Sequence, residues 1–146
     1  MSEYDLQRFL DAQDRVWPTV RAELKAGRKQ THWMWFVFPQ IAGLGLSPTA
    51  QHYAISDLTE AKLYLSHELL GPRLQQAASL VNKVEGKSVG EIFGYPDDLK
   101  LHSSMTLFAE AAPQAEGDSG NGVFTAVLNK YFGGRPDEKT LDLLGD

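Results

Sequence analysis

The chain has 146 residues, of which 42% are hydrophobic and 23% charged, as in an ordinary globular domain. Acidic residues outnumber lysine and arginine by 19 to 14, and the resulting net charge of −5 disfavours a nucleic-acid partner, which usually meets a basic face. The chain contains no cysteine, which excludes disulfides, a thiolate nucleophile and cysteine-bound zinc.

Neither a secretion signal nor a membrane span is evident in the sequence. Residues 2–5 are acidic where a signal peptide would carry its basic region, and no apolar run approaches the ~20 residues that a membrane helix needs. A cytoplasmic protein without membrane contacts is therefore expected.

Helix-start signals recur along the chain. Capping residues or a proline in the first helical turn predict five helix starts, at residues 2–5, 47–48, 57–60, 88–91 and 96–98. The apolar stripe after the first start ends at Gly27, a favourable C-cap, and Pro18 inside it predicts a bend or a new helix start. Gly71-Pro72 predicts a break before a further apolar stripe over residues 74–81.

The C-terminal part contains the longest polar segment. Residues 113–122 are polar and rich in glycine, so a mobile loop is predicted there, with residues 117–122 as its least ordered part. A helix is predicted from Phe124 to Phe132, followed by a last amphipathic turn or two from Asp137 to Leu144.

Two of the three tryptophans lie in one apolar run, residues 33–38. The run has neither helical nor alternating periodicity, so it is expected to be covered on all sides and to form the centre of the fold. Only residues 36–38 have the composition of a strand. The side chains predicted to be largely buried are those of Trp33, Trp35, Phe36, Phe38, Leu101, Met105 and Phe108. The predicted fold is mainly α: a single compact domain over residues 1–146, with short helices packed around the aromatic segment.

The segment after Pro96 carries the first of two candidate functional clusters. Lys100, Ser103 and Ser104 are three and four residues apart and share one face of the predicted helix. A lysine can activate a neighbouring serine as a nucleophile, but the order is the reverse of that in penicillin-binding enzymes, and their other motifs are missing. Helix packing or ligand contact is the favoured interpretation. His102 is interpreted as structural, because no suitably placed carboxylate or nucleophile accompanies it.

The second cluster surrounds the aromatic run. His32 precedes the run, Gln40 follows it, and Trp33 and Trp35 are candidates for the rim of a pocket. The glycine loop at residues 43–45 resembles an anion-binding turn at a helix start, although an ordinary tight turn is favoured. No pair of histidines has the spacing of a metal site, so no metal is predicted, and no motif indicates a cofactor.

The same segments carry a family resemblance. Residues 28–45, in which basic residues and His32 precede the aromatic run and Pro39-Gln40 follow it, resemble the signature of the bacterial domain-of-unknown-function family 1810. Residues 69–74, 92–94 and 97–108 match the family as well. The resemblance implies a single mainly helical domain and no established activity. Members often carry the name calpastatin, but nothing in this chain resembles a disordered calpain inhibitor.

These observations lead to two functional hypotheses. The favoured one is a domain that binds a small polar or anionic ligand in a cleft between residues 32–40 and residues 100–104. Unpaired buried polar groups cost about 1–3 kcal/mol each, so such groups must pair with one another or with a ligand. The predicted ligand-binding residues are His32, Trp33, Trp35, Gln40, Lys100, Ser103 and Ser104. The alternative is a protein–protein interaction module without a small-molecule site. The sequence names no reaction and no protein partner.

Overall fold

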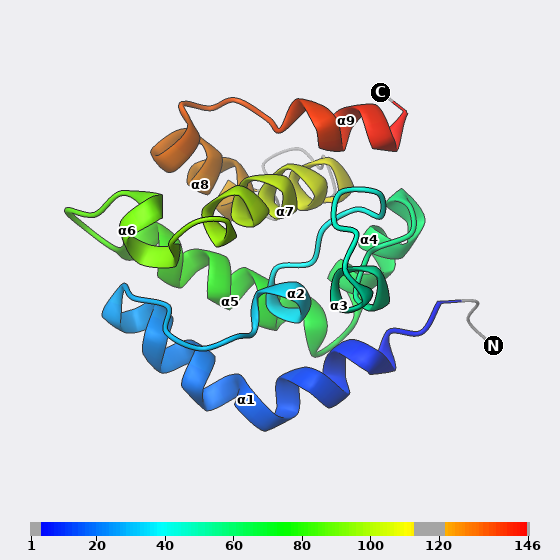
Figure 1. Cartoon of the computed structure of the whole chain (residues 1–146), viewed down its shortest axis with the longest axis horizontal. Coiled ribbons are helices and arrows are strands. Elements are labelled where there is room, and N and C mark those ends of the chain that lie inside the picture. The colour runs from blue at the N-terminus through cyan, green and yellow to red at the C-terminus, as the bar shows by residue number, and fades with distance from the viewer. Residues whose placement is uncertain (1–3, 113–121, 146) are drawn as a thin grey trace.

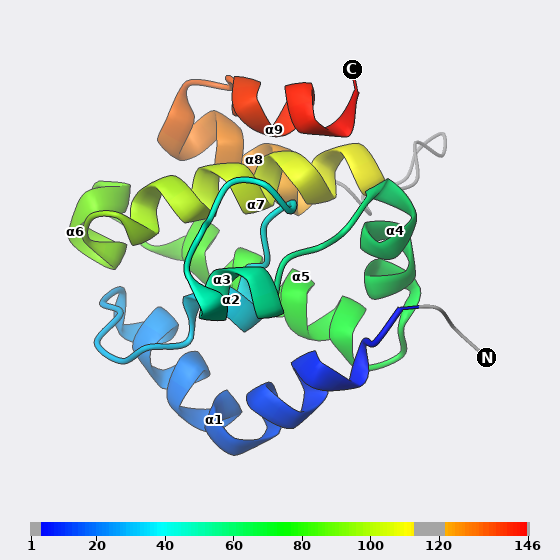
Figure 2. The same cartoon turned by 45° about the vertical axis from the view of Figure 1, so that its right-hand side comes forward.

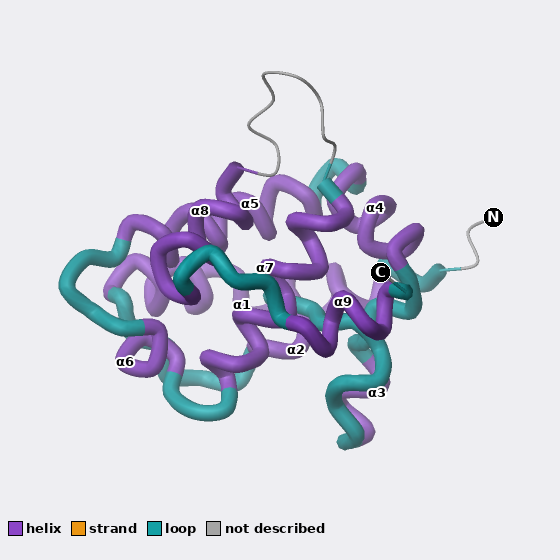
Figure 3. The backbone as a smooth tube through the Cα atoms, turned by 90° about the horizontal axis from the view of Figure 1, so that it is seen from above, coloured by secondary structure: helices purple, strands orange, loops and turns teal. Residues whose placement is uncertain are grey.

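Residues 4–112 and 122–145 are described by the structure, a computed structural model of the chain. Within these ranges the chain consists of helices joined by loops, as Figure 3 shows, and pairing between extended segments is limited to one parallel bridge, between Ile41 and Ile55. The helices are α1 (Gln7–Ala26), α2 (Met34–Val37), α3 (Pro48–His52), α4 (Leu58–Ser66), α5 (Leu70–Lys83), α6 (Val89–Phe93), α7 (Asp97–Ala111), α8 (Gly122–Phe132) and α9 (Glu138–Leu144). The prediction of a mainly α, single compact domain is confirmed. None of the described helices combines the length and the apolar composition needed to cross a membrane.

Several helix ends lie where the sequence predicts them, because the capping group is within one turn of the helix. Ser88 and Glu91 form a capping box at α6: the Ser88 hydroxyl accepts from the Glu91 amide at 3.1 Å, and the Glu91 carboxylate accepts from the Ser88 amide at 2.8 Å. Ser47 caps α3 and Asp57 caps α4 through side-chain oxygens. At its C-terminal end, α1 stops at Gly27, which is left-handed with a φ of 72°.

Other predicted boundaries need correction. Helix α1 begins at Gln7 without a side-chain cap, later than residues 2–5, and it continues through Pro18 with a bend along its length (Figure 1). Gly71-Pro72 does not break the chain but lies in the first turn of α5, where the missing proline N–H needs no partner. Of the loop predicted at residues 113–122, residues 113–121 lie outside the described ranges, and Gly122 begins α8.

Helix α7 is the centre of the packing. It contacts α4, α6, α8 and α9, and every residue from Ser103 to Phe108 is buried. Six consecutive buried residues cover more than one full turn, so neighbours surround this part of the helix on all sides. The short turn α2 lies between α1 and α7 in Figures 1 and 2.

Because α2 is a single turn, tertiary contacts fix its position. The buried Gln13 amide of α1 donates to the Phe36 carbonyl at 2.7 Å and to the Tyr64 hydroxyl of α4 at 2.9 Å. The Gln13 carbonyl accepts from Arg73 Nη1 of α5 at 3.3 Å. This buried amide therefore links four helices with its donor and acceptor both used. Burial raises the pKa of the Tyr64 phenol, which stays neutral in the core.

The predicted burial of the aromatic run is correct for Trp33 and Phe38, which are 1% and 0% exposed. It is wrong in degree for Trp35 and Phe36, which are half-buried. A helical turn rotates consecutive side chains by about 100°, so α2 directs two of its side chains into the core and these two to its edge. The other predicted core residues, Leu101, Met105 and Phe108, are buried.

The approach of α4 to α5 requires a glycine at position 71. A Cβ on Gly71 would lie 2.1 Å from the carbonyl oxygen of Leu65 and 3.0 Å from its carbonyl carbon. These are backbone atoms, so no side-chain rotation relieves the contact and the two helices would have to move apart.

Gly71→Ala is therefore expected to destabilise the protein by about 1–3 kcal/mol, the usual cost of overpacking, although alanine is the better helix former. Gly90→Ala is the matched control, since Gly90 also lies in a helix and a Cβ there would meet nothing closer than 3.8 Å. The control is expected to be neutral or stabilising by up to about 1 kcal/mol. Urea unfolding measures both changes. Equal effects of the two substitutions would contradict the close approach.

Candidate functional site

A groove of about 320 Å³ lies where the loop between α2 and α3, the start of α7 and the start of α9 meet. Figure 2 shows this loop running up to α7. The polar residues that line the groove are Gln40, Lys100, His102, Ser103, Asp137 and Lys139. The structure thus brings together three of the predicted ligand-binding residues, Gln40 from one of the two predicted segments and Lys100 and Ser103 from the other.

Lys100 is held at the groove wall by two interactions. Its ammonium lies 4.9 Å from the ring centroid of Trp35, within the range of a cation–π contact, and 3.6 Å from Asp97 Oδ1. The other oxygen of Asp97 lies 2.8 Å from the ammonium of Lys29, so two lysines share one carboxylate. One negative charge cannot balance both lysines. Lys100 is farther from Asp97 than Lys29 is, and it is more exposed, with 23% of its side chain accessible against 6% for Lys29. The Asp97 carboxylate therefore balances the charge of Lys100 less completely than that of Lys29.

Trp35, another of the predicted ligand-binding residues, contacts the ammonium of Lys100 with the face of its ring. It is half-buried beneath Lys100, and it lines a much smaller recess together with Gln40 and Gly45. The Gln40 side chain makes no hydrogen bond within the described residues, since the contact at this position is a backbone bond from the Ile55 amide to the Gln40 carbonyl. Its amide is therefore free to donate and accept in the groove.

The two serines differ in their contacts. The Ser103 hydroxyl lies 3.2 Å from the Leu99 carbonyl and 3.1 Å from Asp137 Oδ2. The same Asp137 oxygen caps α9 by accepting from the Thr140 amide at 3.2 Å and from the Thr140 hydroxyl at 2.6 Å. Ser103 therefore ties α7 to the start of α9. The Ser104 hydroxyl is buried, without a hydrogen-bond partner in the described part of the chain.

Neither serine hydroxyl is hydrogen-bonded to Lys100 in residues 4–112 and 122–145. A serine nucleophile needs its base within hydrogen-bond reach. The geometry therefore gives no support to a Ser/Lys pair, in agreement with the preference for packing or ligand contact.

Four of the seven predicted residues do not line the groove: Trp35 and Ser104, described above, and His32 and Trp33. His32 is exposed, whereas Trp33 is buried with its indole N–H donating to Glu23 Oε1 at 2.8 Å. The Glu23 carboxylate also accepts from the amides of Gln30 and Thr31 and from the Thr31 hydroxyl. Burial raises the pKa of the Glu23 carboxyl, but these hydrogen bonds outweigh it and hold the pKa below its ordinary value. Trp33 thus closes the turn after α1.

Three polar groove residues are absent from the predicted ligand-binding set: His102, Asp137 and Lys139. His102 stacks on Phe132 with ring centroids 4.2 Å apart, and its Nε2 lies 2.8 Å from the Arg135 carbonyl oxygen. Asp137 and Lys139 reach the groove because α9 packs on α7. Their sequence signal is a helix start, which predicts a cap rather than a site. The described residues hold no cluster of three or more histidine, aspartate or glutamate side chains suited to a metal ion.

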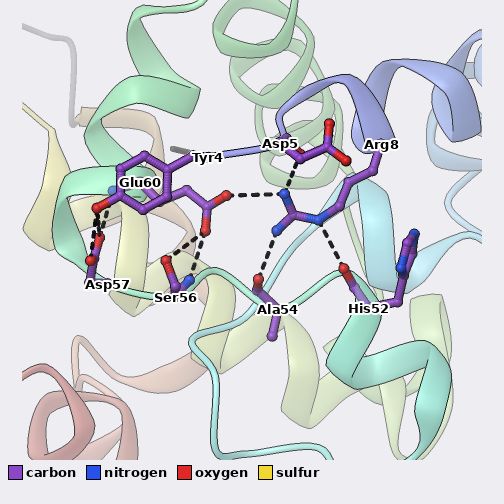
Figure 4. A network of polar contacts seen from close by, with 8 residues as sticks. All are labelled: Tyr4, Asp5, Arg8, His52, Ala54, Ser56, Asp57 and Glu60. Carbon is purple, nitrogen blue, oxygen red and sulfur yellow. Dashed lines mark hydrogen bonds and ion pairs between the residues drawn. The ribbon is translucent and has the colours of Figure 1, made fainter. Parts of the chain in front are cut away.

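A second polar cluster joins α1 to the segment before α4 (Figure 4). The Arg8 guanidinium pairs with Glu60 Oε2 at 3.1 Å, and Glu60 Oε1 accepts from the Ser56 amide at 2.8 Å and the Ser56 hydroxyl at 3.0 Å. Arg8 also donates to three backbone carbonyls, those of Asp5, His52 and Ala54. Four of the five guanidinium N–H groups thus have partners within the protein, so this cluster is structural.

The fold and the groove define an all-helical domain whose central helix carries a polar site at its N-terminal end. The chain matches the family described as "Protein of unknown function (DUF1810)" over residues 3–144, and it belongs to this family. Its structure is similar to the crystal structure of the conserved hypothetical protein Rv1873 from Mycobacterium tuberculosis, with a TM-score of 0.93 and 55% sequence identity, covering 99% of each chain. A search of curated proteins gives no match. The resemblance to the bacterial family 1810 is confirmed.

Proposed function

We propose that this domain binds a small anionic or polar ligand in the groove between residues 32–40 and residues 100–104. The observation that carries the proposal is Lys100, whose ammonium is held over Trp35 at the groove wall while its carboxylate partner is shared with Lys29. A side chain that is already held in place loses little conformational freedom when a ligand arrives, and this favours binding.

The size of the groove also supports a small ligand. Its volume of about 320 Å³ is at the lower end of the ~300–1,000 Å³ typical of ligand pockets. The free amide of Gln40 supplies a donor and an acceptor, and the exposed Lys139 adds a second ammonium. A ligand of the size of a single amino acid with one acidic group fits this combination.

A protein–protein interaction module is the second candidate. Leu46 and Tyr95 are 80% and 82% exposed, and they neighbour the groove residues Gly45 and Pro96 in the chain. Exposed apolar side chains in one place are typical of an interface. A module of this kind needs no small-molecule site, so a small-anion titration separates the two candidates.

Lys100→Gln is expected to weaken small-anion binding about tenfold or more, because a hydrogen bond to a charged group contributes roughly 1.5–3 kcal/mol. The probes are acetate, N-acetylglycine and inorganic phosphate, each titrated into nitrogen-15-labelled protein. The indole N–H resonance of Trp35, which lies under Lys100, reports binding. The indole of Trp33, hydrogen-bonded to Glu23 outside the groove, is the internal reference and is expected not to shift.

Lys62→Gln is the matched control. Lys62 is an exposed lysine of α4 that does not line the groove, so the variant is expected to bind each probe like the parent. A parent protein whose Trp35 resonance responded to none of the probes would defeat the proposal. A Lys100→Gln variant with unchanged affinity for every probe would do so as well.

A further inference from the structure

The exposed apolar residues of this domain gather around the groove. The large apolar side chains that are exposed in the described residues are Leu46, Leu63, Leu69, Tyr95, Leu99 and Leu143. Leu99 lines the groove directly, and Leu46 and Tyr95 each neighbour a lining residue in the chain. Leu143 of α9 lies against Gly43 of the same loop, since a Cβ on Gly43 would meet its side chain at 3.1 Å. Four of the six thus line the groove, neighbour a lining residue in the chain or contact the loop that forms its wall, and these four, residues 46, 95, 99 and 143, are called the apolar rim.

The groove inside this apolar rim has an excess of one positive charge. Lys100 and Lys139 line it against one carboxylate, that of Asp137. The adjoining Lys29 and Asp97 add one charge of each sign, so the excess is unchanged. A protein with a net charge of −5 thus presents a locally positive groove. A single negative charge complements it, whereas a doubly charged phosphate would exceed it.

We propose that the groove and its apolar rim bind the C-terminal end of a partner polypeptide whose last residues are apolar. This inference rests on the proposed function and names its ligand. The terminal carboxylate carries the one negative charge that the groove lacks, and Lys100 is placed to receive it. Gln40, with its amide unpaired in the described part of the chain, pairs with the peptide backbone next to the terminus.

The apolar rim favours a chain over a free small molecule. Leu46 and Tyr95 are about four-fifths exposed, and they follow or precede the residues that enclose the groove. A ligand confined to about 320 Å³ would leave these two side chains in water. A polypeptide that ends in the groove continues over the apolar rim and covers them with its own apolar side chains.

The test follows the Trp35 resonance with three ligands. They are a hexapeptide ending in Val-Leu with a free carboxylate, the same peptide with a C-terminal amide, and N-acetylglycine, which has a carboxylate without an apolar side chain. The free-acid peptide is expected to bind about tenfold or more tightly than its amide, because only the free acid forms the charge-assisted contact with Lys100. It is also expected to bind more tightly than N-acetylglycine, which does not reach the apolar rim.

Two substitutions at exposed leucines test the apolar rim. Leu46→Ser is expected to weaken binding of the free-acid peptide about threefold to tenfold and to leave N-acetylglycine binding unchanged, since Leu46 itself does not line the groove. Leu63→Ser, at an exposed leucine of α4 away from the groove, is expected to change neither. Because Leu46 is 80% exposed, its replacement is expected to leave the fold intact, and Leu99→Ser, at a groove residue that is 53% exposed, repeats the peptide measurement from the side of α7.

The outcomes separate this inference from the proposed function. An amide that bound as tightly as the free acid would overturn the assignment of a polypeptide C-terminus, as would variants at Leu99 and Leu46 with the parent's peptide affinity. Binding of N-acetylglycine that depended on Lys100 would then leave the small-anion groove intact. Absence of any shift that depends on Lys100 would defeat both.

Discussion

Glu60→Gln is expected to lower the free energy of unfolding by about 3–5 kcal/mol, the cost typical of removing one partner from a buried ion pair. Glu60 is 2% exposed, and both of its carboxylate oxygens accept hydrogen bonds, one from Ser56 and the other from Arg8. A glutamine keeps one of these acceptors. Its N–H₂ group must then face either the Ser56 amide or the Arg8 guanidinium, and both are donors. The charge of Arg8, which is 12% exposed, loses its partner as well.

Equilibrium unfolding in urea measures this loss. Asp14→Asn is the matched control, because it removes the Arg73–Asp14 contact of 2.9 Å, in which the Asp14 side chain is 60% exposed. The control is expected to cost at most about 1 kcal/mol, as exposed ion pairs do. The double variant Arg8→Met/Glu60→Gln is expected to lose less than the sum of the single variants, because it leaves neither group unpaired. Similar losses for Glu60→Gln and Asp14→Asn would contradict a buried pair.

The sequence predicts those parts of the fold that depend on contacts between residues only a few positions apart. The capping box of Ser88 and Glu91 closes over three positions, and Gly27 ends α1 by its own backbone conformation. The Asp57–Glu60 signature is a mixed case. Asp57 caps α4 as predicted, but the Glu60 side chain bonds the Ser56 amide and turns toward Arg8. Spacing identifies a helix start without revealing a distant charged partner.

The groove could be predicted in part because two of its three walls come from the two most unusual segments of the chain. Both segments place polar side chains within apolar stretches, and polar groups that are buried need partners. This pattern predicts that the polar side chains near Trp35 lie close to those after Pro96. Its third wall was missed. Asp137 and Lys139 lie at the start of the short helix α9, and its packing on α7 depends on contacts of Asp137 with Ser103 and Thr106, far away in the sequence.

The family motif identifies the fold more directly than it identifies a reaction, and the contacts of its residues explain why. Gly71 allows the close approach of two helices, Ser103 links α7 to α9, and Lys29 pairs with Asp97 across two matched segments. These are structural tasks. Besides His102 and Ser103, the polar residues of the matched segments that line the groove are Lys100 and Gln40.

The two tryptophans of the aromatic run are expected to differ sharply when each is replaced by alanine. Trp33→Ala is expected to cost about 3–5 kcal/mol, as truncation of a buried aromatic side chain does. Trp33 is 1% exposed, packs against Phe38 with ring centroids 6.2 Å apart and donates its indole N–H to Glu23. The variant leaves a cavity and removes one of the hydrogen bonds that the Glu23 carboxylate accepts.

Trp35→Ala is expected to cost less, about 1–2 kcal/mol, because its half-buried ring leaves water only in part. Its larger effect is expected in the groove. Without the ring under its ammonium, Lys100 keeps only the 3.6 Å contact with Asp97 and gains freedom to move, so N-acetylglycine binding should weaken. Urea unfolding gives the stabilities, and isothermal titration calorimetry, which needs no tryptophan signal, gives the affinities. A Trp35→Ala variant that lost as much stability as Trp33→Ala, or that bound N-acetylglycine as tightly as the parent, would contradict the separation of the core tryptophan from the groove tryptophan.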